Sequence, residues 1–373
     1  MILLLIGTSV IAPILTASCN QNHESFFKIS GRNVEFPCQN CLDIYSSTGR
    51  YIPRNIIATR LQIFRDKAIV ALPRYRPGVP FTIAQFKLDS DLWKPKLKPF
   101  ASWTIQEEGN CEAIQNAVDL FMDPMAILWV LDLGICNTLE QPVRRCGPKI
   151  WGLNPEDGKI VKTVNLDTLV STESRLQFLV VDYSDEMIPF AYISDAGTGA
   201  IIVLNLALST GYRVVLPGVV AAHCGAKDIL YLQLSHKPSG NILYFSYLSS
   251  PRLFSIKASY LQTRHTADAL VDVGGKPAGT QMVLLGTNNE SIYFRYKGES
   301  DIYLWNCDSS FKPDNFVLVQ KGGECRMATQ VVSGWKQLML VIESNFHDFI
   351  TNSTGSLDAS VAVYPLDKAS DCT

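Results

Sequence analysis

The sequence predicts an all-β protein, a six-bladed β-propeller built from four-stranded antiparallel blades. Short apolar runs bounded by turn residues occur in pairs, and each run is too short to form a helix. Six such pairs recur at intervals of roughly 45–65 residues, which is the spacing expected for propeller blades. Helical patterns are scarce. Two packed β-sandwiches are the alternative fold.

The six pairs follow one another along the whole chain. They comprise residues 67–72 with 81–86, 127–131 with 149–153, 190–195 with 200–205, 241–246 with 252–256, 291–296 with 301–306, and 337–342 with 360–364. Further strand-like runs at 176–181, 212–216, 229–234, 282–286 and 316–319 bring the total to about four strands per blade.

A propeller ring has to be closed so that no long sheet edge is exposed. We expect an N-terminal strand near residues 56–63 to complete the last blade beside residues 361–364. Residues 111–122 are compatible with a helical turn or two, because their apolar residues have helical spacing. The same residues could equally form a strand ahead of Pro124.

The first residues are apolar and end in small side chains, which is typical of a secretory signal peptide. We therefore divide the chain into a signal peptide (1–18), an N-terminal extension (19–49) and the propeller (50–373). A membrane anchor is the competing interpretation, but the run is short for a span and Pro13 interrupts it. We expect a secreted, extracellular protein with no membrane partner.

The composition argues against nucleic-acid binding. Lys and Arg (33) nearly balance Asp and Glu (35), so the chain carries no basic excess. The usual catalytic signatures, such as GxSxG, HExxH and the phosphate-binding loops, are absent from the sequence. The five histidines are scattered without ligand spacing, so we expect neither a metal site nor a cofactor.

Ten cysteines are consistent with an oxidising compartment. We expect Cys307 to pair with Cys325, and Cys111 to pair with either Cys136 or Cys146, because each pairing closes a short local loop. Cys38 and Cys41 form a CxxC pattern, but the sequence provides neither the βαβ context of a redox motif nor the second ligand pair of a zinc knuckle.

Two sequons, at Asn289 and Asn352, permit N-glycosylation on surface loops. Asp132 and Asp195 each end an apolar strand, where a carboxylate commonly accepts backbone N–H bonds. The short basic patches at residues 74–76 and 144–145 are interpreted as solvated loop residues.

Several segments resemble the insect yellow / major royal jelly protein family. They are RYIPRNIIATR (50–60), ALPRYRPGVPFT (71–82), LWVLDLG (128–134), AYISD (191–195), LYFSYLS (243–249) and LWN (304–306), and the likeness runs from about Val34 to the end of the chain. EEGNC (107–111) and NTLEQPVRRC (137–146) look closest to the yellow-g branch, which is associated with the eggshell and follicle cells.

The resemblance implies a secreted six-bladed propeller with a ligand pocket at one mouth of its central channel. Amine-binding members of the family use a Thr, an Asn and aromatic residues there, and the matching positions are Thr329, Asn345 and Phe81. An aromatic ring, an amide and a hydroxyl suit a small aromatic ligand. The chain departs from the family at residues 345–347, where a basic residue usually follows the Asn. His347 is a candidate general base for tautomerising a dopachrome-like ring.

We therefore expect a secreted structural or maturation protein of insect extracellular matrix, in eggshell or cuticle, with a link to pigment or sclerotisation. Its partners would be a catechol, quinone or amine ligand and other matrix proteins. The alternatives are a dopachrome-type isomerase of the melanin pathway and a biogenic-amine-binding protein. Fold alone does not decide among them.

Overall fold

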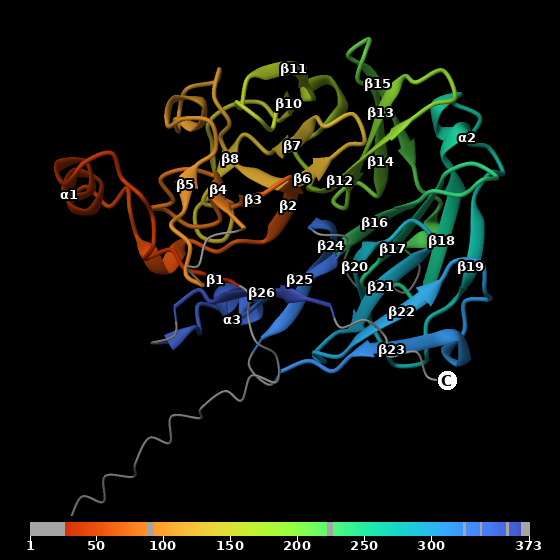
Figure 1. The fold of residues 1–373 in the computed structure, drawn as a ribbon. Coiled ribbons are helices and arrows are strands. Elements are labelled where there is room, and N and C mark those ends of the chain that lie inside the picture. Colours follow the sequence, from red (N-terminus) through yellow and green to blue (C-terminus); the bar gives the residue numbers. More distant parts are fainter. Residues whose placement is uncertain are drawn as a thin grey trace, which may run out of the picture.

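The computed structural model describes residues 27–88, 93–221, 227–323, 326–335, 338–355 and 358–366. It confirms the predicted fold, because six four-stranded antiparallel sheets stand around a common axis (Figure 1). Each predicted pair of apolar runs forms the two middle strands of one blade. Middle strands are covered on both faces by neighbouring blades, which explains why they have the most continuous apolar sequences.

The blades follow the order of the chain, and each runs outward from the axis. Blade 1 contains β2 (Arg60–Phe64), β3 (Lys67–Ala71), β4 (Ile83–Lys87) and β5 (Lys98–Pro99). Blade 2 contains β6 (Ala117–Met122), β7 (Leu128–Asp132), β10 (Lys149–Leu153) and β11 (Ile160–Asn165). Blade 3 contains β12 (Leu176–Tyr183), β13 (Pro189–Asp195), β14 (Ala200–Asn205) and β15 (Thr210–Val215).

The second half of the ring has the same construction. Blade 4 contains β16 (Leu230–Ser235), β17 (Ile242–Tyr247), β18 (Arg252–Lys257) and β19 (Val271–Gly275). Blade 5 contains β20 (Met282–Thr287), β21 (Ser291–Tyr296), β22 (Ile302–Asn306) and β23 (Phe316–Gln320). Blade 6 contains β24 (Met327–Trp335), β25 (Leu338–Ser344), β26 (Val361–Pro365) and β1 (Phe27–Ile29).

Blade 6 combines both ends of the chain and so closes the ring. β1 pairs antiparallel with β26, with Phe27 opposite Val363. An N-terminal strand does close the ring, but the expectation that residues 56–63 supply it is wrong. Residues from Arg60 onward form β2, the innermost strand of blade 1. The three residues of β1 are too few to show an alternating pattern in sequence, which is why they were missed.

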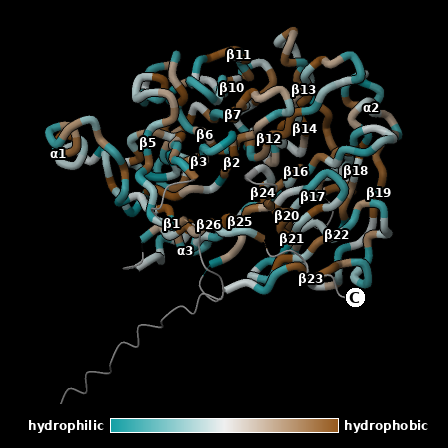
Figure 2. Tube along the Cα trace, in the orientation of Figure 1, coloured by the Kyte–Doolittle hydropathy of each residue, from teal (hydrophilic) through white to brown (hydrophobic). Residues whose placement is uncertain are grey.

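The innermost strands β2, β6, β12, β16, β20 and β24 form the wall of the axis. Each contacts the next, and β24 contacts β2. The apolar clusters lie between neighbouring blades, the outermost strands β11 and β19 are largely exposed, and β15 is mostly half-buried. Figure 2 shows the same distribution, with apolar residues concentrated in the strands of the blades.

Helices are few among the described residues. They are α1 (Gln39–Ser47), α2 (Ala258–Gln262), α3 (Phe346–Thr351) and the 3-10 turns Pro53–Asn55, Thr104–Gln106, Asp167–Leu169, Gly218–Val220 and Pro313–Asn315. A small hairpin of β8 (Ile135–Cys136) and β9 (Val143–Arg144) lies in the connection between β7 and β10 of blade 2. The strand alternative for residues 111–122 is confirmed by β6. None of the helices in the described ranges is long and apolar enough to cross a membrane.

Candidate functional site

An ion pair between Arg60 and Asp119 lies at the axis of the propeller. Arg60, at the start of β2, donates from Nε to Asp119 Oδ1 on β6 at 3.0 Å and from Nη1 to the Thr329 carbonyl on β24 at 3.3 Å. Its guanidinium also lies 5.1 Å from the ring centre of Phe178 on β12. A side chain that reaches three other innermost strands from its own must occupy the axis.

Aromatic side chains surround this ion pair. The rings of Phe178 and Tyr231 lie 5.1 Å apart, and Tyr75, in the loop between β3 and β4, lies 5.7 Å from Phe346 of α3. Tyr75, Phe178 and Phe346 are partly exposed. We call Arg60, Tyr75, Asp119, Phe178, Tyr231 and Thr329 the axial cluster.

The Asp119 carboxylate is held by both blade 2 and blade 3. Its Oδ2 accepts the Leu179 N–H at 2.8 Å, and its Oδ1 accepts the Leu120 N–H at 3.0 Å. Burial raises the pKa of Asp119, and the attraction of Arg60 and these N–H groups opposes that rise. A carboxyl whose pKa is raised above its ordinary value is a candidate for exchanging a proton with a bound molecule.

The tyrosines of the axial cluster remain protonated. Burial raises the pKa of Tyr231 to about 12, and it also raises the pKa of Tyr75. Both phenols can therefore donate a hydrogen bond at neutral pH. The arrangement combines one cation, one carboxyl and phenol donors beside aromatic faces.

β-Bulges in the innermost strands shape the axial wall. Thr329 is the extra residue of β24, between the register pairs of Ala328 and Gln330. In β12, the two residues Gln177 and Phe178 oppose Ser194 alone. Bulges redirect side chains and increase local twist, and they are common at the rims of binding sites.

Amide side chains fasten the innermost strands to one another. Gln330 accepts the Leu61 N–H at 2.7 Å, and Gln62 donates to the Leu120 carbonyl at 2.9 Å. Gln177 accepts the Leu230 N–H at 2.9 Å. These bonds join blades 6 and 1, blades 1 and 2, and blades 3 and 4, so they fix the positions of the strands that carry the axial cluster.

Of the four residues predicted for the ligand site, the structure brings Thr329 to the axis. Its carbonyl accepts from Arg60, and its side chain is partly exposed. Phe81 is fully buried between blades, with its ring 5.1 Å from that of Trp103. Phe81 therefore contributes packing in this structure.

Asn345 and His347 lie at the N-terminal end of α3, where Asn345 is the N-cap. The Asn345 amide donates to the Asp358 carbonyl at 2.8 Å and accepts the Ser360 N–H at 2.8 Å, which fixes the long loop between β25 and β26. His347 is 43% exposed and lies 3.4 Å from the carboxylate of its neighbour Asp348. No contact joins His347 to the axial cluster within the described residues.

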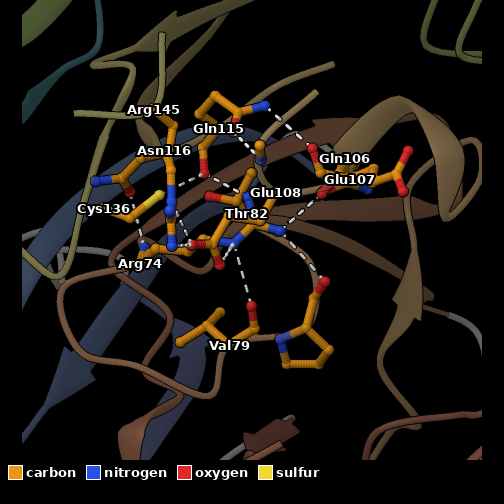
Figure 3. A network of polar contacts seen from close by, with 12 residues as sticks. Arg74, Val79, Thr82, Gln106, Glu107, Glu108, Gln115, Asn116, Cys136 and Arg145 are labelled. Atoms are coloured by element: carbon orange, nitrogen blue, oxygen red, sulfur yellow. Dashed lines mark hydrogen bonds and ion pairs between the residues drawn. The ribbon is translucent and has the colours of Figure 1, made fainter. Parts of the chain in front are cut away.

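Arg74 contradicts the interpretation of residues 74–76 as solvated. Its side chain is 2% exposed, and it donates to the backbone carbonyls of five residues (Figure 3). Those residues are Val79, Pro80, Gln106, Ile114 and Gln115. We call Arg74 and these carbonyls the Arg74 network. Arg76 is also buried, donating to Glu140 at 2.7 Å and to the Phe349 carbonyl at 3.0 Å. Backbone carbonyls leave no signal in sequence, so this burial could not be foreseen.

Asp132 and Asp195 cap turns, as predicted. Asp132 accepts the backbone N–H groups of Gln115, Asn116 and Gly134 at 2.8–2.9 Å. Asp195 accepts the Arg175 N–H at 2.8 Å. Arg144 and Arg145 are exposed, in agreement with a solvated loop.

The cysteines in the described ranges comprise one disulfide and four free thiols. Cys111 pairs with Cys146, which is one of the two pairings expected for Cys111, while Cys136 is a buried free thiol. Cys307 is also a buried free thiol, and its expected partner Cys325 lies outside the described residues.

The sequon residues Asn289 and Asn352 are both exposed, so their glycosylation stays a prediction. The described residues contain no group of three or more His, Cys, Asp or Glu side chains that could hold a metal ion. An open depression of about 530 Å³ is lined by Arg65, Met125 and Glu156 among others. Arg65 directly follows β2, so the depression lies at the opposite end of that strand from Arg60.

Sequence reasoning missed Arg60, Asp119 and Phe178. A weak signal existed, because Arg60 and Asp119 are charged residues inside otherwise apolar strand segments. Their meeting depends on blades 1 and 2 being neighbours at the axis, which spacing along the chain does not reveal.

Comparisons with known proteins agree on one family. A family model described as Major royal jelly protein matches residues 115–366. Dopaminechrome tautomerase from Drosophila melanogaster is 21% identical over 291 residues, covering 70% of this chain and 63% of that protein. Protein yellow from Drosophila melanogaster is 33% identical over 112 residues, covering 29% of this chain and 21% of that protein. The chain thus spans less than two thirds of each of these relatives.

Among solved structures, virginiamycin B lyase from Staphylococcus aureus is similar, with a TM-score of 0.47 and 10% identity. The match covers 84% of this chain and 86% of that one.

Proposed function

Because the chain belongs to the major royal jelly protein family, we propose that it is a secreted protein of insect extracellular matrix that binds a small catechol or quinone at the axial cluster. The observation that carries this proposal is the Arg60–Asp119 pair among partly exposed aromatic side chains. A catechol or quinone has a flat ring and two adjacent oxygens. The ring suits the aromatic side chains, and the oxygens suit a guanidinium and a carboxyl.

The matrix assignment rests on the likeness of residues 107–111 and 137–146 to the yellow-g branch. The Cys111–Cys146 disulfide is consistent with an oxidising extracellular compartment. Antibody staining should therefore label ovary or cuticle. Staining confined to saliva or haemolymph would contradict the matrix role while leaving the ligand proposal intact.

Titration calorimetry tests the ligand proposal directly. We expect heat on adding dopamine or another catechol to the wild-type protein, and about a tenfold loss of affinity in Arg60→Gln. Arg145→Gln is a matched control, since Arg145 is exposed and bonds to Glu108 away from the axis. Absence of heat in the wild type, or equal affinities in all three proteins, would contradict the axial site.

A second candidate function is isomerisation of a dopachrome-like quinone. Two observations favour it: Asp119 has a raised pKa beside a cation, and a relative bears the name Dopaminechrome tautomerase. In this reaction, Asp119 would take a proton from a ring carbon. The electron pair of the broken C–H bond would move into the ring toward the quinone oxygens, where Arg60 would stabilise the developing negative charge. A proton returned to oxygen would complete the tautomer.

The decay of dopaminechrome absorbance measures this activity. We expect the wild type to exceed buffer and Asp119→Asn to lose about a hundredfold in rate, the usual contribution of a positioned acid or base. His347→Ala should leave the rate unchanged, because this exposed side chain has no contact with the axial cluster in the described structure. A loss confined to His347→Ala would overturn the role of Asp119, and decay equal to buffer would remove the enzymatic candidate.

The biogenic-amine alternative gains no comparable support. It was based on Phe81, Thr329 and Asn345, and the side chains of Phe81 and Asn345 are already engaged in packing and loop contacts. Calorimetry with serotonin beside dopamine would separate this alternative from catechol binding.

A further inference from the structure

The two cysteines of the CxxC pattern meet at the start of α1. Cys38 is the N-cap of this nine-residue helix, and its sulfur accepts the Cys41 N–H at 3.3 Å. The two Sγ atoms lie 2.7 Å apart. A disulfide bond is about 2.05 Å long, so the pair could be oxidised with little movement of the helix.

Both thiols can be reached from outside the protein. Cys38 is exposed, Cys41 is partly exposed, and α1 has no buried residue. Figure 1 shows α1 standing away from the blades. A bulky second molecule could therefore approach the two sulfurs without displacing any part of the propeller.

The segment that carries α1 is nevertheless anchored to the propeller. The ring of Tyr45, in α1, lies 5.5 Å from both Phe36 and Trp103, and Phe36 also contacts Tyr51 at 5.0 Å. Trp103 in turn packs on the buried Phe81. These contacts tie the helix to the core of blade 1 while its cysteine-bearing end stays free.

The two cysteines differ in reactivity. The Cys41 thiol and backbone N–H groups lower the pKa of Cys38, against the opposing effects of desolvation and of Asp43, while the Cys38 thiol raises the pKa of Cys41. Thiolates are the attacking species in exchange, so Cys38 is the expected nucleophile and Cys41 the resolving thiol.

The other free thiols in the described residues show the opposite environment. Burial raises the pKa of Cys136 to about 12 and that of Cys307 to about 11. Both are therefore protonated and shielded, which is typical of inert structural cysteines.

We propose that Cys38 and Cys41 form a redox site that reduces an accessible disulfide in a second molecule. The Cys38 thiolate attacks one sulfur of the substrate, forming a mixed disulfide and releasing the first substrate thiolate. Cys41 loses its proton and attacks Cys38, forming the Cys38–Cys41 disulfide and releasing the second thiolate. Two electrons pass from the protein to the substrate, and the reverse reaction with external thiols restores the dithiol.

Equilibration of the full-length protein in glutathione buffers tests this proposal. After alkylation, peptide mass spectrometry reports the redox state of each cysteine separately. We expect the Cys38–Cys41 pair to change state within the accessible ratios of reduced to oxidised glutathione, while Cys111–Cys146 stays oxidised. If the Cys38–Cys41 disulfide resists reduction as Cys111–Cys146 does, the bond is a structural disulfide and the proposal is overturned.

Rates with oxidised glutathione and with a disulfide-bonded peptide give a second test. The reduced wild type should react at Cys38 at least about tenfold faster than at Cys41. Cys41→Ser should accumulate the mixed disulfide at Cys38, and Cys38→Ser should lose the fast reaction. Cys307→Ser is the matched control and should behave as wild type. A faster reaction with the peptide than with oxidised glutathione would indicate a protein substrate, and the reverse would indicate a small-molecule disulfide. Equal rates at Cys38 and Cys41 would contradict the proposal.

Discussion

Arg60 and Arg74 are two arginines withdrawn from solvent to different degrees and satisfied in different ways. Arg74 is 2% exposed, and its side chain bonds to backbone carbonyls, with the nearest carboxylate, Glu108, 3.9 Å away. Arg60 is 17% exposed, pairs directly with Asp119 and faces an aromatic ring. In the first arrangement, all three nitrogens of the guanidinium donate to backbone carbonyls and hold loops together. The second joins two opposite charges at the axis, where we propose that a ligand binds.

The difference shows how burial and partner type separate a structural arginine from a candidate binding arginine. Backbone carbonyls do not change their charge with pH, so the Arg74 network has a single charge state. The Asp119 carboxyl can gain or lose a proton, so the axial cluster has more than one charge state. This distinction predicts that variants in the two regions will fail in different assays.

Replacement of Arg74 should produce the largest effect. Arg74→Met leaves four buried carbonyls and one partly buried carbonyl without this donor, and each buried group costs about 1–3 kcal/mol, although the costs are not additive. We expect a loss of about 4 kcal/mol or more in the free energy of unfolding, measured by urea denaturation. Arg145→Met, in the ion pair with Glu108 at the exposed edge of the same region, should cost less than about 1 kcal/mol. Equal losses in the two variants would show that the Arg74 network is not what holds these loops.

Removal of the disulfide should be the next largest effect and should act on the same region. Cys111 and Cys146 are 35 residues apart, and closing a loop of this length stabilises a protein by about 3–4 kcal/mol in the chain-entropy model. The double variant Cys111→Ser/Cys146→Ser should lose about that much stability in urea denaturation. Its dopamine affinity should remain unchanged, because Arg60 and Asp119 are held by bonds to each other, to Thr329 and to Leu179, in which neither cysteine takes part. A lost affinity with a preserved stability would reverse the assignment of the two regions.

The fold was predictable from sequence because the middle strands of every blade are apolar on both faces. The outer strands carried less signal, and β5 has two residues. In β6, the register shift between Ala117 and Asp119 breaks the period of two, which made this strand resemble a helix. α1 was missed because none of its residues is buried, so it has no apolar stripe to detect.

The candidate site was less predictable, and the reason is geometric. Thr329 was found through the family resemblance, while Arg60 and Asp119 are 59 residues apart and meet through blade adjacency. Phe81 and Asn345 matched a family pattern, but in this chain neighbouring residues occupy their side chains. The ligand class suggested by residue type therefore stays a prediction, and residue type did not identify the atoms that would hold a ligand.

Replacement of Arg60 should have a smaller effect, seen in binding rather than in folding. Arg60→Gln should weaken catechol binding about tenfold, which corresponds to about 1.4 kcal/mol. The same change should raise the pKa of Asp119 further, because the Arg60 charge is the largest influence that opposes burial. Calorimetry measures the affinity, and the acid limb of the dopaminechrome rate profile should move to higher pH. A stability loss as large as that of Arg74→Met would show that Arg60 is structural too.

The smallest effect should be a pH dependence of stability that distinguishes the axial cluster from the Arg74 network. The pKa of Asp119 is raised by burial above its unfolded value near 3.8, so the folded state holds this proton more tightly than the unfolded state. The resulting stability is fully present below the unfolded pKa and is lost as pH rises through the folded pKa. Relative to Asp119→Asn, the free energy of unfolding of the wild type should therefore increase as the pH falls from neutral toward 4, measured by urea denaturation at each pH. Arg74→Met compared with the wild type should show no such trend, because arginine stays charged over this range. A difference between wild type and Asp119→Asn that stays flat or falls with acidification would show that the carboxyl is stabilised by Arg60 more than it is penalised by burial, and the axial cluster would then be as fixed as the Arg74 network.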